Sequence, residues 1–175
     1  MTREEFEQLY REDAGAVLAY ARRRTTREAA DDVVADVFMV AWRRVDDVPA
    51  EPLPWLLGVA RRVLANQRRG ELRGAALRDR IRGQQVSGVR GPLGDDGPSA
   101  AVRALWSLGA SDQELLMLIA WDRLTRAQAA EALGISVGTL AVRLHRARGR
   151  LAKAGVAIGD ADPAYDRPSV MEAAR

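Results

Sequence analysis

The stretch from residue 70 to residue 100 most constrains how this 175-residue chain folds. It contains seven glycines and two prolines, and the apolar spacing seen elsewhere in the chain fades there. Glycine and proline at this density favour a flexible linker over a packed element. We therefore expect two small folded units, one on each side of the stretch. Part of residues 71–85 could continue a preceding helix.

Before this linker, apolar residues recur every three or four positions, which is the spacing of one helix face. One such pattern covers residues 6–21, and a second runs from about residue 27 to residue 45. Three prolines between residues 49 and 54 then interrupt the helices with a short, stiff loop. A third helix is expected from about Trp55 to Arg69, and three helices with short connections predict one compact bundle. The buried stripe predicted for the second helix is Val33, Val34, Val37, Phe38, Ala41 and Trp42.

A second helical unit is expected from about residue 101. Ser111 and Glu114 have the spacing of a capping box ahead of an apolar run. The tail from residue 156 to residue 175 is acidic, contains two prolines and shows little periodicity. It is expected to be loose.

The same unit contains the pattern of a helix-turn-helix. Thr125 and Gln128 repeat the capping-box spacing at the start of a short helix. Gly134 is placed to end this helix, and Ser136 is placed to cap a longer one that reaches about Lys153. A short helix, a three-residue turn and a second helix are the parts of this motif. Its predicted buried seam is Leu133, Ile135, Val137, Leu140, Leu144, Ala147 and Leu151.

The outward side of the longer helix suits DNA. Side chains in the first turns of a recognition helix meet base edges, and arginines hold the flanking phosphates. His145 is the only histidine of the chain, which gives no support to a metal or catalytic site. The positions expected to face outward are Gly138, Ala141, Val142, Arg143, His145, Arg146, Arg148 and Arg150.

Charge is distributed unevenly along the chain, although the net charge is only +3. Residues 1–54 carry 8 arginines against 12 acidic residues, whereas residues 55–90 carry 9 against 2. Residues 111–155 carry 7 basic residues against 4 acidic ones. An acidic front followed by two basic blocks predicts one protein-binding face and two surfaces for a polyanion. Solvated arginine-rich surfaces would have the same composition.

Composition also limits the class of protein. Apolar residues make up 47% and aromatic residues only 5% of the chain, which favours a folded, all-α protein. No apolar run approaches the roughly 20 residues needed to span a bilayer, and the first residues do not resemble a signal peptide. The absence of cysteine excludes disulfides, thiol catalysis and cysteine-ligated zinc. We expect a cytoplasmic protein without membrane insertion, metal or cofactor.

Three motifs carry a resemblance to a known family. The sequence LGISVGTL at residues 133–140, followed by RLHRAR at residues 143–148, resembles the fourth conserved region of extracytoplasmic-function sigma factors. The sequence ADDVVADVF at residues 30–38, followed by AWR at residues 41–43, resembles their second region. The sequence WLLGVARR at residues 55–62 resembles the helix that meets the −10 element. The motifs follow one another in the order of the family.

The resemblance implies a sigma factor that binds core RNA polymerase, directs it to specific promoters and assists melting of the −10 element. Region 2 would occupy residues 1–70, the linker residues 71–100, and the helix-turn-helix of region 4 residues 101–155. The polymerase contacts would be the beta-prime clamp helices and the beta flap, and an anti-sigma factor would be a further partner. The linker would thread across the polymerase toward the RNA exit path. The residues implied to contact the clamp helices are Asp31, Asp32, Asp36 and Arg43.

The resemblance also assigns DNA-contacting residues. The loop from residue 46 to residue 54 would hold a base flipped out of the −10 element, and Trp55 would either stack on DNA or belong to the core. The residues implied for the −10 element are Asp46, Asp47, Trp55, Arg61, Arg62, Asn66, Arg68 and Arg69. Those implied for the −35 element are Ser136, Gly138, Thr139, Ala141, Val142, Arg143, His145, Arg146 and Arg148.

Four positions depart from the family. The family usually has Asn at the position of Arg62 and Asp at that of Asn66, so this helix is more cationic. At Ala141 and Val142 the family commonly has a basic residue and a serine. Alanine and valine make only apolar contacts, for example with a thymine methyl group. We therefore expect an unusual or weakly specified −35 sequence.

Two other classes compete with a sigma factor. A stand-alone regulator could use the same helix-turn-helix, but it would leave the acidic helix and the proline loop without a purpose. A nuclease could bind magnesium through Asp31, Asp32 and Asp36. However, the sequence offers no partnering catalytic group and no glycine-rich phosphate loop. We therefore expect a protein that is not itself an enzyme.

Overall fold

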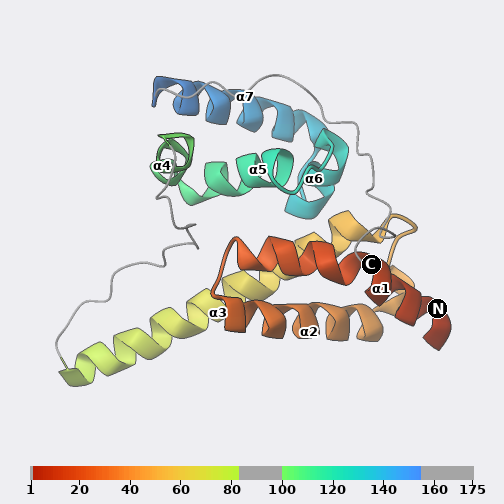
Figure 1. Ribbon diagram of the computed structural model, residues 1–175. Helices are drawn as coiled ribbons and strands as arrows, with labels where there is room; N and C mark the ends of the chain where they lie inside the picture. Colours follow the sequence, from red (N-terminus) through yellow and green to blue (C-terminus); the bar gives the residue numbers. More distant parts are fainter. Residues whose placement is uncertain (1, 83–99, 155–175) are drawn as a thin grey trace, which may run out of the picture. The chain divides into compact units, whose positions relative to one another are not determined.

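The computed structural model describes residues 2–82 and 100–154 (Figure 1). Within these ranges the chain forms seven α-helices, one short 3-10 helix and no strand, which confirms the predicted all-α fold. The chain divides into two compact units, and helices α1 to α3 belong to the first. The predicted tail and residues 83–99 of the predicted linker lie outside the described residues. In the described ranges, no helix is both long enough and apolar enough to cross a membrane.

The first unit begins with two capped helices, α1 (Arg3–Arg22) and α2 (Arg27–Arg43). The Thr2 hydroxyl accepts a hydrogen bond from the backbone N–H of Glu5, and the Glu5 carboxylate accepts one from the Thr2 N–H. The Thr26 side chain caps α2 in the same manner by accepting from the N–H of Ala29. Both helices pack on α3, and the core residues of the unit include Leu9, Val17, Tyr20, Val33, Val37, Leu56, Leu57 and Leu64.

The buried stripe predicted for α2 is confirmed except at Trp42. Half of Trp42 (52%) is exposed, and it lies in the last turn of α2. Its indole packs edge-on against Phe6 of α1, with 4.9 Å between the ring centroids. A side chain at the rim of a helix stripe is buried only if a neighbouring element extends far enough to cover it.

Helix α3 (Pro52–Arg82) is longer at both ends than predicted. Pro52 and Pro54 lie in its first turn, where the N–H that proline lacks would have no partner within the helix. The proline-bounded loop is therefore confined to residues 48–51, and it follows the 3-10 helix η1 (Val45–Asp47). At the other end, α3 continues through the first part of the predicted linker. Two glycines in this stretch lower helix propensity but do not end the helix.

The second unit contains α4 (Ala100–Trp106), α5 (Ala110–Ala120) and α7 (Val137–Lys153). The capping box predicted at Ser111 is wrong, because α5 begins at Ala110 and its N-cap position is occupied by Gly109, two residues before Ser111. The Gln113 amide instead donates to the carbonyls of Trp106 and Leu108, at 3.2 and 2.7 Å, and so closes the turn between α4 and α5. The core between α5 and α7 includes Leu115, Leu118, Leu140, Leu144 and Leu151.

The helix-turn-helix is confirmed as α6 (Arg126–Leu133), a turn and α7. The Thr125 hydroxyl accepts from the N–H of Gln128, and the Gln128 side chain accepts from the N–H of Thr125. Gly134 has a φ of +66°, a conformation that glycine adopts without strain, and Ser136 caps α7 by accepting from the N–H of Thr139 at 3.1 Å. Of the predicted seam, Val137 is wrong, since 49% of it is exposed.

Candidate protein and nucleic-acid interfaces

The outward α2 face consists of Asp31, Asp32, Asp36, Met39, Trp42 and Arg43, all of which are exposed. Residues three, four or seven positions apart share a helix face, so these six side chains form one continuous surface. Within the described ranges, none of the three carboxylates forms an ion pair. Unpaired carboxylates around exposed apolar side chains are suited to a basic partner with an apolar contact point.

Met39 and Trp42 are the two members of this face that sequence reasoning missed. Met39 is 50% exposed and is spaced seven residues from Asp32, which places both on the same side of α2. The helix periodicity of the acidic residues could have identified Met39, because continuing their stripe along α2 reaches it. Trp42 could not be found in this way, because it also fits the buried stripe.

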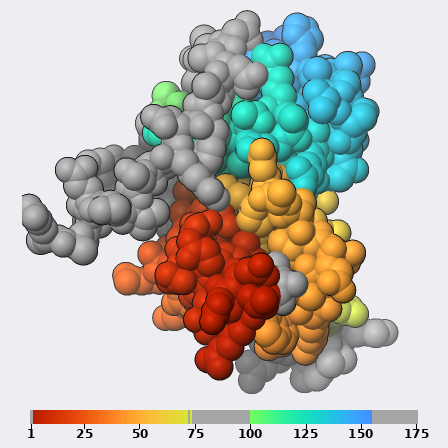
Figure 2. Space-filling model, turned by 90° about the vertical axis from the view of Figure 1, so that its right-hand side faces the viewer, coloured from red at the N-terminus to blue at the C-terminus, as the bar shows by residue number. Residues whose placement is uncertain are grey.

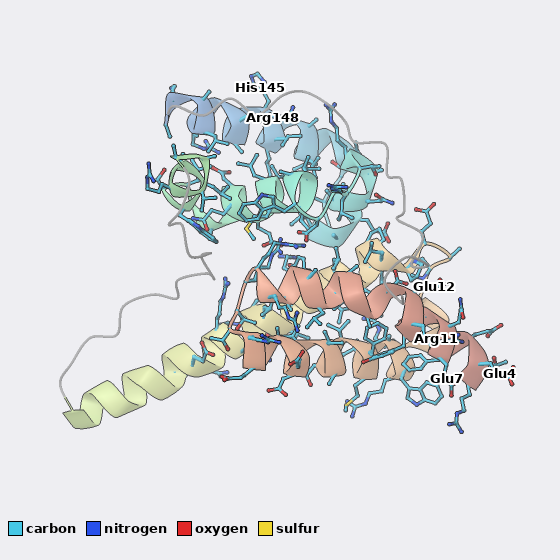
Figure 3. The ribbon with its side chains drawn as sticks, in the orientation of Figure 1. Glu4, Glu7, Arg11, Glu12, His145 and Arg148 are labelled. Atoms are coloured by element: carbon cyan, nitrogen blue, oxygen red, sulfur yellow. The ribbon has the colours of Figure 1, made fainter. Side chains whose placement is uncertain are left out.

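Four aromatic residues join the outward α2 face to α1. The ring of Tyr10, which is 47% exposed, lies edge-on to Phe38 with 4.7 Å between centroids. Phe6 contacts both Phe38 and Trp42, at 6.3 and 4.9 Å. The nearby start of α1 is charged, and Figure 3 labels Glu4, Glu7, Arg11 and Glu12 along it. The exposed aromatic surface therefore has an acidic border on α1 as well as on α2.

The segment between α2 and α3 is held by Arg44. Its Nε and Nη2 atoms both lie 2.8 Å from Oδ2 of Asp47, and its guanidinium lies 5.8 Å from the ring centroid of Trp55. Asp46 is exposed, whereas Asp47 is engaged by this ion pair. Trp55 is half-buried, so it contributes to packing and still presents part of its surface. Figure 2 shows this segment in orange and the start of α1 in red on one face of the molecule.

The basic residues predicted on α3 have different surroundings. Arg62, Asn66 and Arg69 are exposed and spaced four and three residues apart, so they form one stripe on α3. The Arg69 guanidinium donates to the Asn66 side chain, and Arg62 donates to the carbonyl of Gly58 at 3.0 Å. Arg68 instead donates to the backbone carbonyl of Arg24 at 3.0 Å and so ties α3 to the end of α1. Arg61 precedes Arg68 by seven residues, so the two side chains lie on the same side of α3.

The exposed surface of α7 agrees with most of the prediction. Gly138, Thr139, Ala141, Val142 and Arg143 are exposed, as are Ser136, His145 and Arg146. Figure 3 shows His145 on the side of α7 that faces away from α5.

Two arginines of α7 depart from the predicted surface. Arg148 is half-buried. The Nε and Nη2 atoms of Arg150 lie 2.6 and 2.9 Å from the two carboxylate oxygens of Asp112 on α5, and this hydrogen bonding raises the pKa of Arg150. Arg150 therefore joins α7 to α5, and the exposed arginines of the recognition surface are Arg143 and Arg146.

The described residues contain no group of His, Asp or Glu side chains placed to hold a metal ion. The carboxylates of the outward α2 face are thus arranged as a surface and do not converge on a common point.

Comparisons with known proteins identify the family of both units. The Sigma-70 region 2 family matches residues 9–74, and the Sigma-70 region 4 family matches residues 100–151. The chain is 31% identical over 149 residues to the ECF RNA polymerase sigma factor SigL of Mycobacterium tuberculosis, covering 79% of this chain and 82% of SigL. It is 32% identical over 149 residues to the RNA polymerase sigma factor CnrH of Cupriavidus metallidurans, covering 75% and 74%.

One solved structure is similar over nearly the whole chain. It is the sigma factor RpoE of Bartonella quintana in complex with the anti-sigma factor NepR. The TM-score is 0.64 at 27% sequence identity, and the match covers 86% of this chain and 96% of that one. The two-unit helical architecture is therefore shared with a protein of known structure.

Proposed function

The chain belongs to the extracytoplasmic-function sigma factors of bacterial RNA polymerase, and from this premise we propose which of its surfaces binds which partner. As a sigma factor it binds core RNA polymerase and directs the enzyme to specific promoters. It acts by binding rather than by chemistry of its own, and it works in the cytoplasm, where the polymerase transcribes.

The outward α2 face docks on the beta-prime clamp helices of the core polymerase. The observation that supports this most directly is that carboxylates without an ion pair lie next to two exposed apolar side chains on the same helix face. Charged residues at an interface speed and orient association, whereas buried aromatic side chains contribute most of the affinity. Asp31, Asp32 and Asp36 form the charged rim, and Met39 and Trp42 supply the apolar contact.

The −10 element is bound by the α3 stripe and the segment before it. Arg62 and Arg69 track the phosphates of the opened strand, and the exposed part of Trp55 offers a surface on which a base can stack. Arg44 pairs with Asp47 before residues 48–51 and lies over the ring of Trp55 after them, so it lies beside the loop proposed to hold the flipped base. Asp46 stays free to accept a hydrogen bond from that base.

The −35 element is bound by α7 in the major groove, as a recognition helix is in other helix-turn-helix proteins. Arg143 and Arg146 hold phosphates, while the exposed residues before them lie toward the base edges, namely Ser136, Gly138, Thr139, Ala141 and Val142. The same unit contacts the beta flap of the polymerase.

Charge reversal on the outward α2 face tests the docking surface. We expect the Asp32→Lys, Asp36→Lys double variant to bind purified core polymerase at least about tenfold more weakly, because it places like charges against a basic partner. Affinity is measured by titrating labelled full-length protein with core polymerase at fixed salt. Circular dichroism should show an unchanged helix content, because both positions are exposed.

The matched control is Glu71→Lys, Glu131→Lys, which changes the net charge equally at two exposed positions outside α1 and α2. It should lower the affinity far less. Equal losses in the two double variants would mean that only the overall charge matters, and unchanged binding of the α2 variant would remove the assignment.

An anti-sigma factor is a second partner of this chain. This proposal is supported by the similar sigma factor RpoE, whose structure contains the anti-sigma factor NepR. A protein recovered with the full-length chain from its own cells, and released by an excess of core polymerase, would support it. A protein that stays bound when the holoenzyme forms would not be an antagonist of this kind.

A further inference from the structure

Val142 lies at the centre of the outward surface of α7. The buried residues Leu140, Leu144 and Ala147 define the inner side of this helix. With 3.6 residues per turn, each residue is rotated by about 100° from the last, which places Val142 almost opposite the centre of these three. Its side chain is 52% exposed. An exposed β-branched residue is unfavourable on a solvated helix, both for hydration and for helix propensity.

The two hydroxyl groups at the start of α7 contact each other. The Ser136 hydroxyl accepts from the N–H of Thr139, and the two hydroxyls lie 2.9 Å apart within hydrogen-bond distance. The next outward side chain along the helix belongs to Ala141, which is apolar. The part of α7 that meets base edges therefore presents methyl groups where a recognition helix usually presents hydrogen-bonding groups.

The surroundings of Val142 favour a close approach to duplex DNA. Arg143 and Arg146 are exposed beside it and complement the phosphate charge. Gly138 precedes Val142 by one turn on the same side, and a Cβ atom added there would meet no atom within 4 Å. The packing of the chain therefore does not require a glycine at this position, although glycine in a helix costs about 1 kcal/mol relative to alanine. The absence of a side chain at Gly138 would let a bound duplex come closer to the backbone of α7.

We propose that Val142 determines the specificity of the −35 contact by packing against the C5 methyl group of a thymine. The major-groove edge of B-DNA carries one apolar group, this methyl group, and a valine side chain can bury it without hydrogen bonds. This inference rests on the proposed binding of α7 to the −35 element. It specifies that the contact is made by Val142 with the C5 methyl group of a thymine.

Deoxyuridine tests the contact because it differs from thymidine only by the methyl group. The −35 element is first selected from a random library with holoenzyme containing the full-length chain, and each selected thymine is then replaced by deoxyuridine. At one of these positions, we expect the replacement to weaken holoenzyme binding about fourfold, which is the effect of removing one buried methyl group. Val142→Ala should bind both DNAs with the same affinity, because it no longer reaches the methyl group.

Arg146→Ala is the matched control on the same helix. It should weaken binding to both DNAs equally and retain the fourfold preference for thymine, because a phosphate contact carries no base information. Alanine favours a helix more than valine, so Val142→Ala keeps α7 folded.

The outcomes separate the two proposals. If the holoenzyme selects no −35 element, both the binding of α7 and the role of Val142 fail. If it selects one but deoxyuridine is tolerated at every thymine, or if Val142→Ala keeps the preference, only the role of Val142 is overturned.

Discussion

Arg146 and Arg150 are one helical turn apart on α7, yet they have different surroundings. Arg150 makes two hydrogen bonds with the Asp112 carboxylate, at 2.6 and 2.9 Å, and so contributes to the packing of α7 on α5. Arg146 is exposed and has no partner among the described residues. A free guanidinium on a cationic helix is available to a phosphate, whereas the charge of Arg150 is already paired with a carboxylate that engages two of its five N–H donors.

We therefore predict that Arg146→Ala weakens binding of the holoenzyme to promoter DNA irrespective of the −35 sequence. Losing one phosphate contact releases fewer counterions, so the slope of log affinity against log salt should become shallower by about 0.9. Binding is measured by fluorescence anisotropy between about 50 and 200 mM salt. A loss confined to particular −35 sequences would show that Arg146 reads a base instead.

At the scale of elements, α2 combines two faces with different partners. Its inner face is buried against α1 and α3, and the three carboxylates of its outward face form no ion pair among the described residues. Trp42 belongs to neither face completely, because it contacts Phe6 and is still half-exposed. A large aromatic side chain in that position is a typical centre of a protein–protein interface.

Trp42→Ala should lower the affinity for core polymerase by at least about tenfold, since truncating such a residue commonly costs ~2 kcal/mol or more. The free energy of unfolding should change much less, because half of the side chain is already in water. Trp106→Ala, at another partly exposed tryptophan, serves as the control. If both variants bind core polymerase normally, the apolar part of the docking surface lies elsewhere.

The turn between α6 and α7 depends on the backbone of one residue. Gly134 has a φ of +66°, and a Cβ there would meet no atom within 4 Å, so the conformation rather than space requires glycine. Gly134→Ala should destabilise the unit by about 1–2 kcal/mol, measured by urea unfolding. Gly138→Ala, in the regular helix, is the control and should stabilise it by ~0.5–1 kcal/mol. If Gly138→Ala lowered the free energy of unfolding more than Gly134→Ala did, the assigned turn would be contradicted.

At the scale of the whole molecule, the two proposed DNA-binding surfaces belong to separate compact units. The α3 stripe belongs to the first unit and α7 to the second. Two moderate contacts that are joined by a tether bind a long site more tightly than either does alone. Substitutions in separate units without shared partners are also expected to be additive in free energy.

We predict that Arg69→Ala combined with Arg146→Ala lowers promoter affinity by the product of the two single effects. On a DNA that contains the −35 element alone, only Arg146→Ala should have an effect, because the α3 stripe has no target. Both comparisons use holoenzyme and the same anisotropy assay. An Arg69→Ala effect of equal size on the truncated DNA would indicate that α3 does not act at the −10 element.

The sequence by itself was sufficient for the features that depend on neighbouring residues. The helix-turn-helix follows from Thr125, Gln128, Gly134 and Ser136, whose hydrogen bonds and backbone angles involve residues within one turn. The division into helices follows from apolar spacing, which is also local. The family could be identified for the same reason, because its motifs are short and contiguous.

Only the tertiary structure decided which side chains remain free to act. Trp42 and Val137 fit the buried stripes by spacing, yet about half of each side chain is exposed. Arg68 and Arg150 read as DNA-facing but bond to groups 44 and 38 residues away along the chain. Burial and pairing depend on contacts between elements far apart in the sequence, and helix periodicity contains no information about where those elements end.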